Sequence, residues 1–216
     1  MIKRYKGRII IAVLVLISIV VLLMQKKVAF VLGGAFTNLG YMMQDGLHEY
    51  DLVHHEDITP EQVVATFDMQ NKMASEIRSR FPRTSHHPLV ALVLCMDSRL
   101  DSSEVMGDTR KYYYIIRTAG SVIKEKEEEM LELAVTNGVK VILFTTHTNC
   151  AAEAVASDPK RKEDFPFLTA AVVDREKYIK DFLSRPKIAK KVADGSLIIK
   201  HAIVDTNTKR LTILDK

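Results

Sequence analysis

Three runs of the chain are apolar almost throughout, and they restrict the fold more than any other feature of the sequence. These runs are PLVALVL (88–94), YYYII (112–116) and VKVILFT (139–145). They lack the regular alternation of polar and apolar residues that marks a strand with one solvated face. Nearly continuous apolar strands are typical of parallel sheets that helices cover on both faces. The runs therefore predict an α/β protein.

Helical patterns precede, separate and follow these runs. The first begins at Thr59-Pro60, an N-cap hydroxyl followed by a proline at the first helical position, with Gln62 at the third. We expect helices within residues 59–81, 124–138, 169–185 and 186–195, and two final strands around a polar turn at 206–208. Strands that alternate with helices predict a largely parallel sheet flanked by helices.

Two of the predicted strands lead directly into reactive side chains. Cys95, Asp97 and Arg99 follow the first run, and His147 and Cys150 follow the third. The carboxyl ends of parallel strands meet at one edge of a sheet, and this is where sites assemble. We therefore expect the two cysteines and the histidine to converge.

Two thiolates and one imidazole form a known ligand set for zinc. Structural zinc sites usually have four protein ligands, and no fourth Cys or His stands at a suitable spacing in this chain. Three ligands leave a position for water, whose pKa zinc lowers toward about 7. The pattern therefore favours a catalytic zinc ion. Asp97 is placed to orient the bound water, and Arg99 is placed to keep Asp97 ionised.

Other interpretations of the two cysteines explain fewer of these residues. A disulfide between Cys95 and Cys150 would be ordinary in an exported protein, but it gives His147, Asp97 and Arg99 no role. A nucleophilic pair of Cys95 and His147 leaves Cys150 unexplained.

The first 27 residues differ from the rest of the chain. Four basic residues precede an apolar run at 9–24, and Lys26-Lys27 closes it. The run is shorter than the roughly 20 residues that span a bilayer, but flanking Lys and Arg side chains can extend it by snorkelling. We expect a single-pass membrane anchor, with a cleaved secretory signal as the alternative. The excess of basic residues before the run predicts a cytoplasmic N terminus and an exported catalytic domain, which would be secreted or periplasmic after cleavage.

The net charge of +4 arises in this N-terminal segment. Six of the 31 basic residues lie in the first 27 positions, which leaves 25 basic against 27 acidic residues in the remainder. A weakly acidic body has no electrostatic footprint for nucleic acid. The expected organisation is an anchor or signal at 1–27, a linker or arm at 28–57 and a catalytic domain at 58–216.

Together these motifs resemble the β-class carbonic anhydrases. The resemblance rests on Cys-x-Asp-x-Arg after a buried strand, IIRTAG at 115–120 and His-x-x-Cys after a later strand, and it extends from about residue 59 to the C terminus. It implies reversible hydration of carbon dioxide to bicarbonate and a proton in homodimers or tetramers. The implied site residues are Cys95, His147 and Cys150 on one zinc ion per chain, the Asp97–Arg99 dyad, and Thr118, Ala119 and Gly120 in the substrate pocket. The resemblance also implies a closed state in which Asp97 itself binds zinc.

The chain departs from the family pattern at three positions. Asn149 and Ala151 stand where the family commonly has Asp and Gly around the second cysteine, and Thr118 stands where it commonly has Asn. None of these changes removes a ligand or the dyad, so they bear on catalytic efficiency more than on metal binding. Two alternatives stay open: a carbonyl sulfide or carbon disulfide hydrolase on the same site, and a zinc-binding scaffold module without catalysis.

Overall fold

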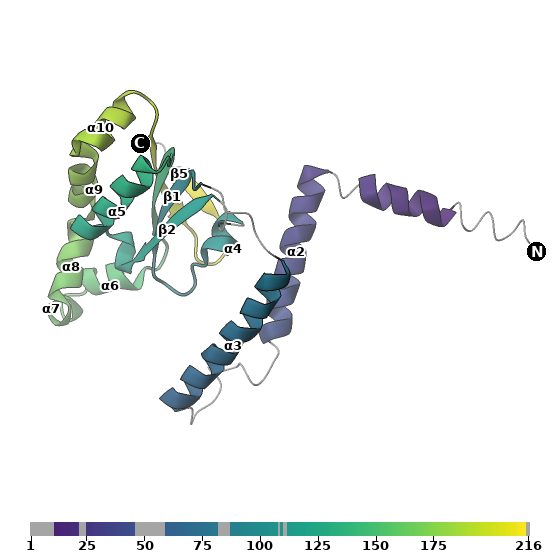
Figure 1. Cartoon of the computed structure of the whole chain (residues 1–216). Helices are drawn as coiled ribbons and strands as arrows, with labels where there is room; N and C mark the ends of the chain where they lie inside the picture. Colours follow the sequence, from purple (N-terminus) through teal and green to yellow (C-terminus); the bar gives the residue numbers. More distant parts are fainter. Residues whose placement is uncertain are drawn as a thin grey trace, which may run out of the picture. The chain divides into compact units, whose positions relative to one another are not determined.

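The computed structural model describes residues 11–21, 25–45, 59–81, 87–107, 109 and 112–214 (Figure 1). The chain divides into two compact units, residues 1–83 and 84–216. All strands of the described residues belong to the second unit.

The second unit is built on a five-stranded sheet with the order β2-β1-β3-β4-β5. Its strands are β1 (Val90–Cys95), β2 (Tyr113–Thr118), β3 (Val141–His147), β4 (Ile198–Val204) and β5 (Leu211–Leu214). The first four are parallel, and β5 pairs with β4 in the antiparallel direction. The α/β fold with a largely parallel sheet is confirmed, and so are the two strands around the polar turn.

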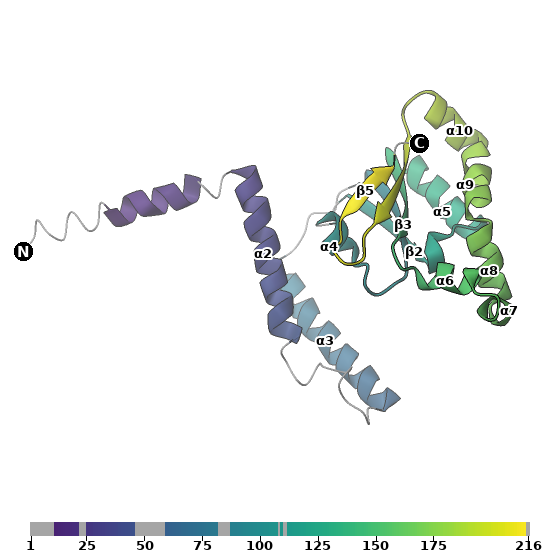
Figure 2. The same ribbon diagram turned by 180° about the vertical axis from the view of Figure 1, so that it is seen from behind.

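Each face of the sheet buries its own apolar cluster, which explains the lack of alternation in the runs that form β1 and β3. The run at 112–116 was also expected to be buried on both faces, but it forms the edge strand β2, in which only Ile116 is buried. Ala91 and Val93 of β1 face one cluster, and Leu92 and Leu94 face the other. In Figures 1 and 2, α5 and α9 lie on one side of the sheet and α4 lies on the other. The helices are α4 (Ser102–Met106), α5 (Glu125–Thr136), α6 (Ala151–Ser157), α7 (Arg161–Asp164), α8 (Pro166–Val173), α9 (Arg175–Ser184) and α10 (Pro186–Ala193).

The helix expected over residues 169–185 is two helices in the structure. Helix α8 ends at Val173, and α9 begins at Arg175 after a residue with φ −87° and ψ 6°. The Arg175 guanidinium pairs with Glu153 of α6 at 2.6 Å. Glu153 is far away in the sequence, so no local pattern could have indicated this contact.

The first unit holds helix α2 (Lys26–Asp45), which begins just before the segment that we interpreted as a linker or arm. Gly33, Gly34 and Gly40 lie inside this helix, and glycine lowers helix propensity, so the sequence did not indicate a helix here. Residues 46–57 of the predicted arm lie outside the described part of the chain.

Helix α3 (Pro60–Arg80) confirms the first predicted helix. Thr59 Oγ1 accepts a hydrogen bond from the Gln62 backbone N–H at 3.3 Å, and Gln62 Oε1 accepts one from the Thr59 N–H at 2.7 Å. These reciprocal bonds form the capping box that the sequence predicts. By its internal contacts α3 belongs to the first unit, although the sequence assigned it to the catalytic domain.

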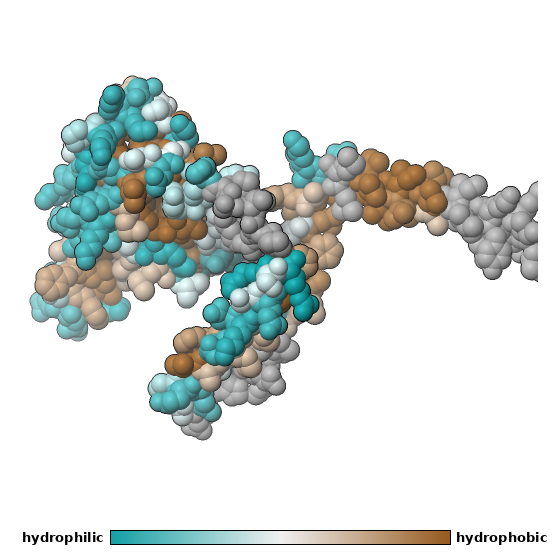
Figure 3. All heavy atoms as spheres, in the orientation of Figure 1, coloured by the Kyte–Doolittle hydropathy of each residue, from teal (hydrophilic) through white to brown (hydrophobic). Residues whose placement is uncertain are grey.

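Within the described residues, no single helix combines the length and the apolar character that a membrane crossing requires. Ile11–Val21 and Lys26–Gln44 meet that requirement only as a pair with a bend of 92° between them. Figure 3 colours Ile11–Val21 as almost wholly hydrophobic. Residues 9, 10 and 22–24 of the apolar run lie outside the described residues.

The two-faced core makes a stability prediction. Phe182 of α9 is fully buried and packs edge-on against Phe144 of β3, with ring centroids 6.2 Å apart. Truncation to alanine would leave a cavity between the helix and the sheet, so Phe182→Ala should lower the free energy of unfolding by about 3–5 kcal/mol. Urea denaturation of the full chain, followed by circular dichroism, measures this loss.

Phe167→Ala on α8 is the matched control, because that side chain is 85% exposed. It should change the free energy of unfolding by less than about 0.5 kcal/mol. Equal losses in the two variants would contradict the assignment of the core.

Candidate metal centre

The structure brings Cys95, His147 and Cys150 together, as the sequence predicted. Cys95 is the last residue of β1, His147 is the last residue of β3, and these strands are parallel neighbours. Cys150 follows a two-residue turn and immediately precedes α6. The ligand atoms of the three side chains lie within 4.8 Å of one another, and all three residues are buried.

The orientation of the His147 ring suits a metal ion. Its Nδ1 lies 3.0 Å from the Thr148 carbonyl oxygen, which can only accept, so Nδ1 carries the proton. Nε2 is then a lone-pair donor, and it is buried without a hydrogen-bond partner. A buried polar atom without a partner is destabilising, and a metal ion would satisfy it. The outer hydrogen bond also fixes the tautomer in the way typical of metal-binding histidines.

The two thiols are free and contact each other. The hydrogen bond between them lowers the pKa of Cys95 and raises the pKa of Cys150, and burial raises the pKa of Cys150 further. As a coupled pair they lose their first proton more readily than an ordinary thiol and hold the second more tightly. A divalent cation would displace the second proton as well, because the thiolate is the metal ligand.

Asp97 and Arg99 form a bidentate ion pair beside this cluster. Arg99 Nε donates to Asp97 Oδ1 at 2.9 Å, and Arg99 Nη2 donates to Asp97 Oδ2 at 2.7 Å. Hydrogen bonds from Arg99 hold the pKa of Asp97 well below its usual range, so the carboxylate is ionised. Arg99 Nη2 also donates to the Asn149 carbonyl oxygen at 3.0 Å. The dyad is thus tied to the loop that carries His147 and Cys150.

Arg117 is a positioning residue that the sequence analysis did not single out. From β2 its Nη2 donates to the Asp97 carbonyl oxygen at 2.7 Å, and its Nε donates to the Cys95 carbonyl oxygen at 3.3 Å. Both bonds fix the backbone between the first cysteine and the aspartate. The signal was present, since Arg117 is the arginine of the IIRTAG motif.

The predicted pocket residues lie where β2 continues into the short helix η2 (Ala119–Ser121). Thr118 Oγ1 donates to the Val122 carbonyl oxygen at 2.6 Å, so its hydroxyl is engaged with the backbone. Gly120 has φ 64°, and a Cβ at this position would come within 3.0 Å of Val172. The Gly120 backbone also hydrogen-bonds Cys95. Their role toward a substrate stays a prediction.

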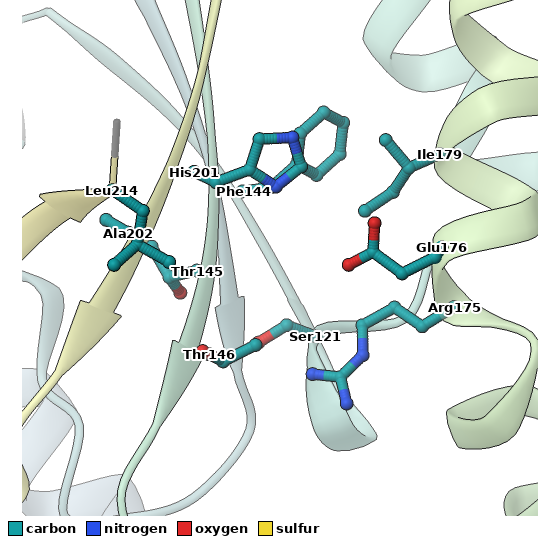
Figure 4. Close-up of a pocket in the computed structure, with 10 residues that line it drawn as sticks. All are labelled: Ser121, Phe144, Thr145, Thr146, Arg175, Glu176, Ile179, His201, Ala202 and Leu214. Carbon is teal, nitrogen blue, oxygen red and sulfur yellow. The ribbon is translucent and has the colours of Figure 1, made fainter. Parts of the chain in front are cut away.

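A separate cavity of about 90 Å³ is lined by none of the three cluster residues (Figure 4). Arg175 and Glu176 reach into it from α9, and His201 of β4 lies beside Phe144, with ring centroids 5.8 Å apart. The Ser121 hydroxyl lines the cavity and is buried without a hydrogen-bond partner. A polar lining of this kind suits ordered water.

The model of the carbonic anhydrase family matches residues 90–212, more than half of the chain. The match includes the cluster, the dyad and the whole sheet up to β5. This chain belongs to the carbonic anhydrase family. The predicted resemblance is therefore confirmed at the level of the family.

Solved carbonic anhydrases share this fold. The enzyme from Streptococcus mutans is 23% identical, with a TM-score of 0.53 over 69% of this chain and 97% of that chain. A tetrameric β-carbonic anhydrase from Sordaria macrospora is 17% identical, with a TM-score of 0.55 over 72% and 98% of the two chains. The β-carbonic anhydrase CafA of Aspergillus fumigatus is 18% identical, with a TM-score of 0.55 over 71% and 91%. No curated protein matches the sequence.

The Asp97–Arg99 pair makes a pH prediction. The folded-state pKa of Asp97 lies below its unfolded value of about 3.9, so ionised Asp97 stabilises the fold above that pH. This contribution is lost as the pH falls through the folded-state pKa. Arg99→Gln removes the bidentate partner, so Asp97 should titrate at a higher pH in the variant than in the wild type. Carboxyl ¹³C NMR of the zinc-free protein measures both titrations.

Arg161→Gln is the control, because the Arg161 side chain is exposed on α7. Its Asp97 titration should match that of the wild type. If Arg99→Gln also left the Asp97 titration unchanged, the guanidinium would not be the cause of the low pKa.

Proposed function

We propose that this chain is a zinc-dependent β-carbonic anhydrase that hydrates carbon dioxide reversibly to bicarbonate and a proton. The observation that supports this function most directly is the buried Cys95–His147–Cys150 cluster in a chain of the carbonic anhydrase family. One imidazole nitrogen of the cluster has no hydrogen-bond partner. The ionised Asp97–Arg99 dyad beside the cluster supplies the polar groups that the reaction needs.

Cys95, His147 and Cys150 would hold one zinc ion per chain. When bound, zinc supplies a Lewis acid that lowers the pKa of a water molecule enough to give a nucleophile near neutral pH. Two thiolates neutralise the formal charge of the ion, so the acidifying effect is weaker than with three neutral imidazoles. The protein must therefore contribute orientation, and the residues around the cluster provide it.

Asp97 is suited to hold the attacking water. Its carboxylate is ionised, and an ionised carboxylate can only accept hydrogen bonds, so it fixes the direction of the water's O–H group. Arg99 fixes the rotamer of Asp97 through two hydrogen bonds, and Arg117 fixes the Asp97 backbone through a third. Orienting the nucleophile in this way removes entropy from the barrier.

Metal analysis and stopped-flow hydration assays on the full-length chain test this function. Asp97→Asn should keep about one zinc per chain and lose about 10-fold or more in rate, the usual loss for an outer partner of a metal site. Cys150→Ser should lose zinc, because two ligands bind the ion much less tightly than three. Asp181→Asn is the matched control on an exposed face of α9 and should behave as wild type.

Each other result has a defined meaning. Full activity in Cys150→Ser would refute the ligand assignment. Zinc at one per chain without hydration at mildly alkaline pH, but with hydrolysis of carbonyl sulfide or carbon disulfide, would assign the rival substrates to the same site. Zinc at one per chain without hydration and without hydrolysis of carbonyl sulfide or carbon disulfide would indicate a zinc-binding scaffold module.

We also propose that the enzyme is a homodimer or a homotetramer. Helix α3 has no buried residue in the single chain, yet it exposes Val64, Phe67 and Ile77. An apolar stripe on a helix is typical of a surface that packs against a partner. The structurally similar enzyme from Sordaria macrospora is a tetramer. The oligomeric state of this chain stays a prediction.

We propose that residues 1–27 attach the protein to a membrane, with the catalytic domain on the exported side. The support is the apolar run between basic flanks, of which Ile11–Val21 is helical. Full-length protein should sediment with membranes and resist extraction from them by alkaline carbonate. Leu16→Lys should release the protein from the membrane, because a charge within the apolar run opposes insertion.

N-terminal sequencing of the membrane-bound protein distinguishes the anchor from a signal. An intact N terminus supports the anchor, whereas a new N terminus beyond residue 27 supports a cleaved signal. A catalytic domain that externally added protease cannot reach in sealed, right-side-out vesicles would contradict the exported topology.

A further inference from the structure

We propose that the turn between β4 and β5 clamps the two loops of the metal centre, and that Lys209 and Thr206 are positioning residues for the reaction. The proposal rests on the proposed function. One loop carries Cys95, Asp97 and Arg99, and the other joins His147 to Cys150. Neither motif includes any residue of the turn, which lies more than fifty positions further along the chain.

The first contact of the turn is made by Lys209. Its Nζ donates to the Arg99 carbonyl oxygen at 2.5 Å and to the Thr206 carbonyl oxygen at 3.0 Å. Arg99 is thus held at two points. Its guanidinium donates hydrogen bonds to the Asp97 carboxylate, and its carbonyl oxygen accepts one from Lys209 Nζ. Figure 2 shows β5 beside α4, the helix that begins just after this loop. The lysine therefore restrains the backbone that carries the dyad.

The second contact of the turn is made by Thr206, which is buried. Its backbone N–H donates to Thr148 Oγ1 at 3.0 Å, and the two threonine hydroxyls lie 3.0 Å apart. The Thr148 N–H donates to the Val204 carbonyl oxygen at 3.0 Å. Thr148 in turn accepts the Nδ1–H of His147. A continuous set of hydrogen bonds therefore leads from the turn to the imidazole ring.

Hydrogen bonds within the turn hold it in one conformation. Asp205 Oδ1 accepts hydrogen bonds from the Asn207 N–H at 3.0 Å, the Thr208 N–H at 2.8 Å and Thr208 Oγ1 at 3.0 Å. The Lys209 N–H donates to the Asp205 carbonyl oxygen at 2.8 Å. These bonds organise the turn around one carboxylate and fix the direction in which the lysine leaves it.

The backbone at Lys209 indicates that the side chain has a role beyond the turn. Its φ is 58°, in the left-handed region where glycine is favoured and most other residues are strained. Turn formation alone would be better served by glycine. Strain that persists at one residue points to a function of that residue, and the only hydrogen bonds of Lys209 Nζ within the described chain are those to the two carbonyls.

Lys209→Gly separates positioning from folding, because it removes the side chain and relieves the backbone strain at once. In the full-length zinc-loaded protein, we expect an unchanged or higher thermal midpoint and about one zinc per chain. We expect kcat for hydration to fall about 10-fold, at the lower end of the range for outer partners of metal sites. The NMR signal of the Arg99 Nε–H, which bonds Asp97, should shift and broaden in both zinc-loaded and zinc-free protein.

Two further variants complete the test. Lys209→Arg keeps a cation of similar reach and should recover part of the lost kcat. Asn207→Ala changes an exposed side chain of the same turn without touching either contact, and it should match the wild type in every measurement.

Wild-type kcat together with a wild-type Arg99 signal in Lys209→Gly would overturn the proposal. A loss of rate that only parallels a loss of thermal stability would also overturn it, because the lysine would then act on folding alone. If wild-type protein showed neither zinc nor hydration, the proposed function would fail. The Arg99 signal of the zinc-free variant would still decide whether the turn positions the dyad.

Discussion

The parallel pairing of β1 with β3 is the constraint on which the rest of the structure depends. The two strands lie side by side in the middle of the sheet, so their carboxyl ends deliver Cys95 and His147 to the same edge. Residues 91–95 of β1 are all buried, which makes the strand a rigid support for its last side chain. Burial on both faces therefore explains the apolar sequence of the strand and the precision with which a metal ligand is held.

A second set of contacts makes the edge of the sheet into a chemical site. The Arg99 guanidinium binds the Asp97 carboxylate and the Asn149 carbonyl, and Arg117 binds two carbonyls of the first loop. Each of these arginines donates to backbone oxygens that would otherwise need other partners beside a buried cluster. The same bonds that satisfy the backbone also fix the carboxylate. Stability and orientation are therefore linked at this site.

The sequence predicted the parts of the fold that depend on local patterns. Thr59 and Gln62 predicted a capped helix, and the apolar runs predicted strands, of which β1 and β3 are buried as expected and the edge strand β2 is not. Prediction failed at the break before Arg175, which no local pattern in the sequence marks. The contact of Arg175 with Glu153 on another helix likewise depends on the tertiary fold. Prediction also failed for α2, because three glycines lower the helix propensity of this segment and the sequence did not indicate a helix. Propensity is a weak guide in such segments because context can outweigh it.

The sequence by itself determined the chemistry of the site, because thiolates and an imidazole come only from Cys and His, and Asp97 and Arg99 supply a charged dyad. The order of these residues along the chain also matches the strand ends. Only the tertiary structure decided their mutual arrangement. It showed which imidazole nitrogen is buried without a hydrogen-bond partner, that Arg117 supports the first loop, and that Lys209 reaches Arg99 from 110 residues away. The physical reason is that a hydrogen bond depends on distance in space, and only the folded sheet brings such distant residues within reach.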